Sequence, residues 1–115
     1  MRIPDDLPDN DALIYHATSK SDWEAAKEKG IFDRSTRGKS FTEVGFIHAS
    51  GKDQIQRIID FIYGKTDEEL VLLTLNKDEL AHAGIEVKYE DGGDGELFPH
   101  IYAPIPTALI TSSNL

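Results

Sequence analysis

Short apolar runs alternate with polar segments along the whole chain. The runs are rich in valine, isoleucine, leucine and aromatic residues, a composition typical of β-strands. We expect one strand in each of them, at residues 12–18, 45–50, 70–76, 85–90, 97–106 and 108–113. The segment LVLLTLN at residues 70–76 is the most apolar of the six, which predicts the central strand of a sheet.

The segment from Ser21 to Gly30 carries the signals of a helix. Ser21 and Glu24 form the Ser-x-x-Glu pattern of a capping box at the start. Gly30 follows the last helical residues, where glycine commonly ends a helix in a left-handed conformation. A shorter helical turn is predicted farther along the chain, at residues 77–84.

A second helix is predicted after the strand that contains His48. Ser50 is placed to cap it, with Asp53 at the acidic position three residues later and Gly64 at the end. Apolar residues recur within it at the spacing of a single helix face, at Ile55, Ile58, Ile59 and Ile62. That face is expected to pack on a sheet.

The remaining segments are polar. Residues 33–40 are predicted to form a loop that holds the densest basic patch of the chain, Arg34, Arg37 and Lys39. Residues 91–96 read as a flexible acidic loop. Six strands with two or three helices, the helices mainly early, predict an α+β domain of two small, mostly antiparallel sheets.

The length of 115 residues suits one domain. We expect a flexible acidic lead-in at residues 1–11, which carry four aspartates and two prolines, and a single α+β domain at residues 12–115. The lead-in has no apolar core of a signal peptide, and no apolar run approaches the roughly 20 residues of a membrane helix. The chain has no cysteine. These features predict a cytoplasmic protein without membrane contact.

The charge balance is strongly acidic. Twelve lysines and arginines stand against 21 aspartates and glutamates, which gives a net charge of −9. Such a surface repels phosphate backbones, so nucleic acid is not expected as the main partner. A small-molecule nucleotide or an anionic metabolite is the partner that fits the features described next.

Three of the four histidines occur in the same local pattern. Each has a large apolar residue two positions before it and a hydroxyl residue two positions after it. The pairs are His16 with Thr18, His48 with Ser50, and His100 with Tyr102. In a strand, positions two apart share a face, so each histidine is predicted to lie beside its hydroxyl. Histidines grouped in this way indicate a site, whereas a single one in an apolar strand is usually a hydrogen-bonded core residue.

Three further features bear on the chemistry. Gly51 and Lys52 begin the second helix, where free backbone N–H groups and a lysine favour an anion. Glu90 and Glu96 are candidate catalytic carboxylates in a segment with five acids that can equally face water. His82 has no partner pattern and is expected at the surface.

The segments IYHAT, GFIHAS and ELFPHIYAPIP together resemble a bacterial family catalogued as domain of unknown function 952. The resemblance runs from Leu13 to Ile110, and the strand end VKYE with Glu90 also fits the pattern. Two positions depart from it: Ala49 stands where the family typically has cysteine, and Ala103 where it has glycine. The first departure removes any role for a thiol.

The resemblance implies a fold of the ADP-ribosyltransferase-like class, whose members bind NAD in a cleft between two small sheets. By position, His16 resembles the first-strand histidine that contacts the nicotinamide ribose in that class. His48 resembles the middle residue that helps to hold nicotinamide. The third role, support of the reacting centre, is open among Glu90, Glu96 and His100. A related phosphotransferase reaction on RNA is opposed by the net charge of −9.

Three functions follow as hypotheses. The first is a cleft that binds NAD or a related nucleotide as substrate, without a resident cofactor or metal, and with enzymatic activity left open. Its catalytic candidates are His16, His48, Glu90, Glu96 and His100, and its binding candidates are His16, Thr18, His48, Ser50, Gly51, Lys52 and Tyr102. The second is a non-catalytic module for a small anionic metabolite. The third is a metal-dependent hydrolase that uses His16, His48 and His100.

Overall fold

The apolar run predicted as the central strand is the middle strand of a three-stranded sheet in the computed structural model, which describes all 115 residues. Strand β6 (Leu70–Asn76) pairs antiparallel with β1 (Leu13–Ser19) on one side and β10 (Ile110–Asn114) on the other. Side chains of β6 are buried on both faces of this sheet, which explains its almost unbroken apolar sequence. The prediction of a central strand is confirmed.

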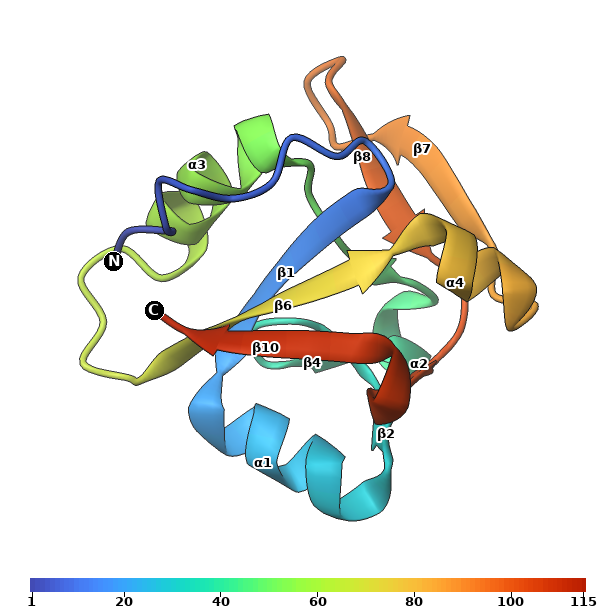
Figure 1. Cartoon of the computed structure of the whole chain (residues 1–115). Helices are drawn as coiled ribbons and strands as arrows, with labels where there is room; N and C mark the ends of the chain where they lie inside the picture. The colour runs from blue at the N-terminus through green and yellow to red at the C-terminus, as the bar shows by residue number, and fades with distance from the viewer.

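Two helices cover the opposite faces of this sheet. Helix α1 (Lys20–Lys29) buries Trp23 and Ala26 against one face, in a core cluster with Leu73. Helix α3 (Lys52–Ile62) buries Ile55 and Ile59 against the other face, in a second core cluster. Figure 1 shows the sheet with α3 and α1 on either side of it. The sheet therefore separates two hydrophobic cores.

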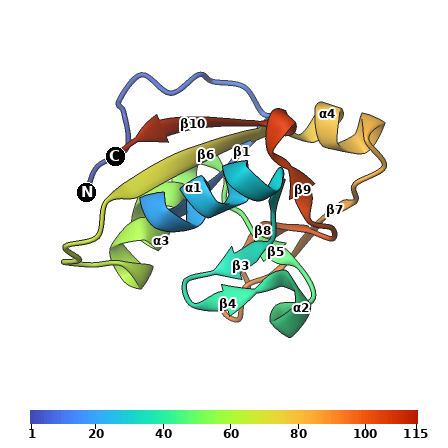
Figure 2. The same cartoon turned by 90° about the horizontal axis from the view of Figure 1, so that it is seen from below.

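A second three-stranded sheet holds two of the three patterned histidines. Its strands lie in the order β5 (Ile47–His48), β8 (Leu97–Ile101) and β7 (Val87–Asp91), all antiparallel. The two sheets meet at the edge of β1, where Tyr15 and Ser50 exchange two backbone hydrogen bonds of 2.8 Å. In Figure 2 this second sheet lies to one side of the first.

The expected α+β domain of small antiparallel sheets is confirmed, but the chain forms four sheets and four α-helices. Two of the sheets are ribbons of two short strands each. The remaining elements are β2 (Ile31–Phe32) with β9 (Ile105–Pro106), β3 (Arg34–Thr36) with β4 (Lys39–Ser40), α2 (Phe41–Val44), α4 (Lys77–His82) and the 3₁₀ turn η1 (Thr107–Leu109). Strands of two or three residues are too short to show a period of two, so the sequence pattern missed them.

Three predicted segments need correction. The predicted loop at residues 33–40 contains the β3–β4 ribbon, and the run at 97–106 is divided between β8 and β9. Helix α1 is capped by Ser19 rather than Ser21, because the Ser19 hydroxyl accepts from the backbone N–H of Asp22 at 3.1 Å. Its end before Gly30, at a φ of 85°, is as predicted.

Helix α3 also begins one residue later than predicted. Gly51, not Ser50, precedes its first turn, and its N–H donates to the Gln54 side chain at 2.9 Å. Ser50 is unavailable as a cap because its backbone is paired with Tyr15. The tertiary contact between the sheets thus determines where the helix starts.

Residues 1–11 contain no helix or strand and run along α3 (Figure 1). The backbone N–H of Ile3 donates to the Gln56 side chain at 2.8 Å, and Lys52 donates to the carbonyl of Leu7 at 2.8 Å. Ile3 and Leu7 pack against the core cluster under α3. No helix of the chain has the length and apolar character needed to cross a bilayer.

Removal of a buried side chain from β6 tests this core. Leu73 is fully buried between β6 and α1, so Leu73→Ala is expected to lower the free energy of unfolding by about 2–5 kcal/mol. The matched variant Leu97→Ala removes the same atoms from a side chain that is 54% exposed, with an expected change within about 0.5 kcal/mol. Urea denaturation measures both; equal losses would contradict the assignment of the core.

Candidate functional site

His16 lies on the edge strand β1 at the junction between the two sheets. Its side chain is buried, and its ring packs edge-on against Phe32 with centroids 5.3 Å apart. Its Nδ1 donates a hydrogen bond to the backbone carbonyl of His48. Because a carbonyl can only accept, the proton of the neutral ring is on Nδ1 and Nε2 carries a free lone pair.

Burial keeps His16 and His48 neutral at physiological pH. Loss of solvent lowers the pKa of His16 to about 4, although its hydrogen bond to the His48 carbonyl opposes the shift. Burial also lowers the pKa of His48, and the neighbouring His100 adds to this effect. At pH 7 both rings are therefore hydrogen-bonding groups rather than positive charges.

His48 and His100 lie side by side on the paired strands β5 and β8. They are partners in the strand register, and their rings stand at 89° with centroids 5.1 Å apart. Phe46 stacks on His100 at 4.0 Å and meets the edge of His48 at 4.8 Å. The three rings therefore form a tight group on the face of the second sheet opposite Ile47 and Ile101, which are buried in the core.

Glu90 on β7 binds two members of the predicted site. Its Oε1 lies 3.0 Å from Nδ1 of His100 and also accepts from the hydroxyl of Tyr102. These bonds, that from Tyr102 first, lower the pKa of Glu90 below its usual range. The same bond raises the pKa of Tyr102, because the neutral phenol is the donor. Glu90, His100 and Tyr102 thus form one hydrogen-bonded unit.

Two adjoining hollows beside α3 form one cleft. They share five lining residues, Thr36, His48, Ser50, Ile58 and Ile62. The smaller hollow, of about 30 Å³, extends to Tyr15 and His16. The larger, of about 280 Å³, extends to Phe98 and His100. His16, His48 and His100 therefore border a single cavity, which we call the histidine cleft.

Two residues that line the histidine cleft, Tyr15 and His100, each have a buried polar atom without a partner. The hydroxyl of Tyr15 and Nε2 of His100 make no hydrogen bond, and the same holds for Nε1 of Trp23 and Nε of Arg34 outside the cleft. Buried polar groups in folded proteins are nearly always paired. These atoms are covered by protein, so they do not themselves form the surface of the cleft.

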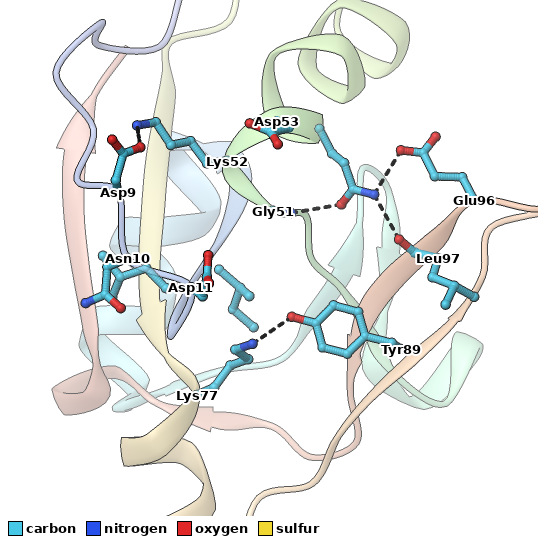
Figure 3. A pocket seen from close by; sticks show the side chains of 13 residues that line it. Asp9, Asn10, Asp11, Gly51, Lys52, Asp53, Lys77, Tyr89, Glu96 and Leu97 are labelled. Atoms are coloured by element: carbon cyan, nitrogen blue, oxygen red, sulfur yellow. Dashed lines mark hydrogen bonds and ion pairs between the residues drawn. The ribbon is translucent and has the colours of Figure 1, made fainter.

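Other predicted site residues lie in a different pocket, of about 650 Å³, shown in Figure 3. Gly51, Lys52 and Glu96 line it, but each is already engaged within the chain. The N–H of Gly51 donates to Gln54, the Lys52 ammonium binds the carbonyl of Leu7 and the Asp9 carboxylate, and Glu96 accepts from Gln54 and Arg57. The anion-binding role of Gly51 and Lys52 stays a prediction.

The predicted residues thus divide into groups. His16, His48, Ser50 and His100 line the histidine cleft, while Glu90 is bonded to His100 and Tyr102 is bonded to Glu90. Thr18 is buried and lines neither pocket. No group of three or more histidine and carboxylate side chains is placed to hold a metal ion, so the geometry does not support the third hypothesis, in which His16, His48 and His100 bind a metal. Nδ1 of His16 and of His100 are already hydrogen-bonded elsewhere.

Sequence reasoning missed part of the cleft wall. Thr36 lies in the polar segment predicted as a loop, where no pattern marked it. Ile58 and Ile62 were expected only as core, yet they also line the cleft. Phe61 lies at its mouth and is 86% exposed. The sequence did contain one signal for this wall: Phe61 is a large aromatic residue of α3 that lies outside the buried isoleucine face of the helix.

The fold and cleft describe a small α+β domain with a histidine-lined cavity. The chain belongs to the family described as "Protein of unknown function (DUF952)", whose model matches residues 17–113. The family resemblance drawn from the sequence motifs is confirmed. No functionally curated protein matches the chain.

Solved structures of protein CC0527 from Caulobacter crescentus are similar to this chain. Its crystal structure is 32% identical in sequence, with a TM-score of 0.72 over 90% of this chain and 85% of that one. A crystal structure of a double mutant gives the same values, and the solution NMR structure has a TM-score of 0.70. The descriptions of these structures name no activity.

Neutral His16 makes the fold sensitive to mild acid. Because its folded pKa of about 4 lies below the unfolded value of about 6.5, the unfolded chain binds the proton first as the pH falls. The contribution of neutral His16 to the free energy of unfolding is therefore complete above pH 6.5 and is lost as the pH falls towards 4. Between pH 7 and pH 5 the loss from His16 is about 2 kcal/mol.

We expect His16→Asn to remove this share of the pH dependence. The asparagine amide can still donate to the His48 carbonyl, but it does not titrate. Chemical denaturation at pH 7 and pH 5 measures the change, and His82→Asn, an exposed histidine on α4, is the matched control. An unchanged pH dependence in His16→Asn would contradict the burial of a neutral His16.

Proposed function

We propose that the histidine cleft binds NAD or a related nucleotide and cleaves its bond to nicotinamide, as an ADP-ribosyltransferase-like enzyme. The observation that carries the proposal is that His16, His48 and His100 border one cleft, with Nε2 of His16 not used in a hydrogen bond within the chain. A nucleotide has both the length and the hydroxyl and amide groups to contact side chains spaced along such a cleft. The cleft lies where the two three-stranded sheets meet, as in the class that the sequence resembles.

The histidine cleft presents hydrogen-bond acceptors. Nε2 of His16 carries a free lone pair because Nδ1 donates to the His48 carbonyl, and the ring is neutral at pH 7. Ribose hydroxyls can donate a hydrogen bond to Nε2 of His16. An ionised carboxylate or phosphate has no proton to donate, so its oxygen lone pairs would repel the lone pair of Nε2. The arrangement therefore favours a sugar-bearing ligand over a small anion at this position.

The opposite wall is apolar and suits a flat ring. Ile58, Phe61 and Ile62 of α3 face the larger hollow, together with Phe98 of β8. Phe98 packs directly on Gly92, where a side-chain carbon would lie 2.6 Å from its ring. Aromatic and aliphatic walls with few polar groups are typical of sites for bases and similar rings. This wall supports nicotinamide or a purine as part of the ligand.

Positive charge near the cleft compensates in part for the acidic surface. Arg37 donates to the carbonyl of Ile62, a lining residue, at 3.0 Å and pairs with Glu68 at 2.6 Å. Lys39 is exposed on the same β3–β4 ribbon that supplies Thr36. A pyrophosphate near this ribbon could pair with Lys39 directly, and with Arg37 if it displaced the Glu68 carboxylate.

A non-catalytic binding module is the second candidate function. It is favoured by the position of Glu90, which binds His100 and Tyr102 and does not line the cleft. A carboxylate held in this way does not itself reach a bound nucleotide. Binding without turnover would be its signature.

Isothermal titration calorimetry with NAD, ADP-ribose and nicotinamide tests the proposal, followed by an assay of nicotinamide release. His16→Asn keeps the bond to the His48 carbonyl and removes the Nε2 acceptor. We expect it to weaken NAD binding about three- to tenfold, the value of one hydrogen bond.

His82→Asn is the control and should bind as the unmodified chain does, because His82 lies outside the cleft. Circular dichroism confirms that both variants are folded. Absence of heat with NAD and with ADP-ribose would overturn nucleotide binding. Binding without release of nicotinamide would favour the non-catalytic module.

A further inference from the structure

We propose that the larger hollow of the histidine cleft holds the purine base of the bound nucleotide, with Phe61 stacked on the base and His48 hydrogen-bonded to its edge. The inference rests on the nucleotide binding in the proposed function and names the class of ligand, a purine nucleotide. It assigns Phe61 and His48 as binding residues, and it concerns recognition of the ligand rather than cleavage of the bond to nicotinamide.

Phe61 presents its ring to solvent at the mouth of the larger hollow. The side chain is 86% exposed, although it lines the hollow together with Ile58 and Ile62 of the same helix. An exposed phenyl ring costs free energy that a covering ligand recovers. The other exposed large apolar side chains of the chain line no part of this hollow; they are Met1, Ile31, Tyr89 and Leu97. Phe61 is therefore available to stack on a flat ring that enters the hollow.

Phe98 of β8 supplies a second aromatic wall, and Gly92 makes room for it. Both residues line the larger hollow. A side-chain carbon at Gly92 would lie 2.6 Å from Cδ2 of Phe98 and 2.7 Å from Cε2, which is closer than van der Waals contact allows. The glycine thus lets the Phe98 ring lie against the backbone of the turn between β7 and β8. The larger hollow is therefore bounded by aromatic rings from both α3 and β8.

The larger hollow is lined without any lysine, arginine, aspartate or glutamate. The oxidised nicotinamide of NAD is a pyridinium cation. A cation that enters a hollow without a counter-charge loses hydration and gains no ion pair in return. The attraction of a cation to an exposed phenyl ring is weaker than this loss. A purine is neutral at pH 7, so the larger hollow favours the purine over the nicotinamide end of NAD.

His48 offers the polar contact that a base requires. Its ring is half-buried and lines both hollows of the cleft. Neither ring nitrogen bonds within the chain, and neither is among the polar atoms that the protein covers, so both are accessible. Burial, together with the neighbouring His100, lowers the pKa of His48. The neutral ring has one N–H donor and one lone pair, which match the N7 acceptor and N6 amino donor of adenine.

The smaller hollow suits the ribose that is attached to the base. Its volume of about 30 Å³ admits a hydroxyl group but not a second ring. It reaches His16, whose Nε2 is not used in a hydrogen bond within the chain. The two hollows share His48 and Ser50 as lining residues, and a base and its ribose are joined by a single bond. A purine nucleoside therefore matches the sequence of groups along the cleft, from Phe61 to His16.

Isothermal titration calorimetry of the full chain tests the class of ligand. AMP and ADP-ribose contain the purine, whereas nicotinamide mononucleotide joins the pyridinium ring to the same ribose and phosphate. We expect AMP to bind about tenfold or more tightly than nicotinamide mononucleotide, the value of one base stacked on an aromatic side chain. Equal affinities, or tighter binding of nicotinamide mononucleotide, would overturn the proposal.

Phe61→Ala tests the stacking residue. We expect it to weaken the binding of AMP and of ADP-ribose about tenfold, and Phe61→Tyr, which keeps the ring, to bind within about threefold of the unmodified chain. Because Phe61 is 86% exposed, the midpoint of urea denaturation should not change in either variant. Leu97→Ala, an exposed apolar residue that lines the other pocket, is the control and should bind AMP normally. Unchanged AMP affinity in Phe61→Ala would overturn the proposal.

His48→Phe tests the polar contact. The variant keeps an aromatic ring and removes both nitrogens, while the bond from His16 goes to the backbone carbonyl of residue 48 and does not depend on the side chain. We expect AMP binding to weaken about three- to tenfold, the value of one hydrogen bond. Circular dichroism shows whether the variant is folded. Full AMP affinity in folded His48→Phe would overturn the assignment of His48.

NMR spectroscopy gives a direct readout of where the base lies. Nuclear Overhauser effects are expected between the ring protons of Phe61 and Phe98 and the H2 or H8 protons of bound AMP. A change that only altered the fold would not create them. Such effects to the nicotinamide protons of bound NAD, in place of the adenine protons, would put nicotinamide in the larger hollow and overturn the inference.

The outcomes separate this inference from the proposed function. Failure of the unmodified chain to bind NAD, ADP-ribose and AMP would overturn both. Binding of NAD without binding of AMP would overturn the inference and leave the proposed function standing. Binding of AMP that persists undiminished in Phe61→Ala would overturn the inference alone.

Discussion

The contact between strand β1 and residues 48–50, at the end of β5 and just after it, is the interaction on which the rest of the structure depends. Tyr15 and Ser50 exchange two backbone hydrogen bonds, and His16 adds a third from its side chain to the His48 carbonyl. These three bonds join the two larger sheets at the open edge of β1. They also determine where α3 begins, because Ser50 is held in the bridge and leaves Gly51 to precede the helix. The contact also brings His16 of β1 next to His48 of β5, and both residues line the histidine cleft.

The same contact sets the electrostatic character of the site. His16 takes the place of a backbone donor at this sheet edge, so its Nδ1 must keep its proton. Burial lowers the pKa of His16 to about 4, and the ring is therefore uncharged at pH 7. Stability and recognition are therefore linked through one side chain. The cleft gains acceptors without gaining positive charge, while the cations lie apart on the β3–β4 ribbon. This separation would suit the nucleotide ligand proposed above, which has hydroxyls and phosphates in different parts of the molecule.

The helix start at Gly51 shows how local chemistry can mislead. Free N–H groups beside a lysine are the usual signs of an anion site, yet Gln54 occupies the first N–H and Asp9 pairs with Lys52. Both partners reach this position through folding: Gln54 by helical geometry, and Asp9 by the course of residues 1–11 along α3 (Figure 1), which brings its carboxylate to Lys52 (Figure 3). The sequence could not reveal that a distant acidic segment supplies the counter-charge.

The sequence by itself determined the class of fold, the central strand, the two main helices and the three histidines, because apolar periodicity and side-chain chemistry are local properties. It also identified the family through motifs that contain His16, His48 and His100. Only the tertiary structure decided which candidates share a cavity, since that depends on the bridge between Tyr15 of β1 and Ser50. It placed Gly51 and Glu96 in another pocket and connected Glu90 to His100 across a strand pair. Strand register and the crossing of sheets arise from contacts between distant residues, which no local pattern encodes.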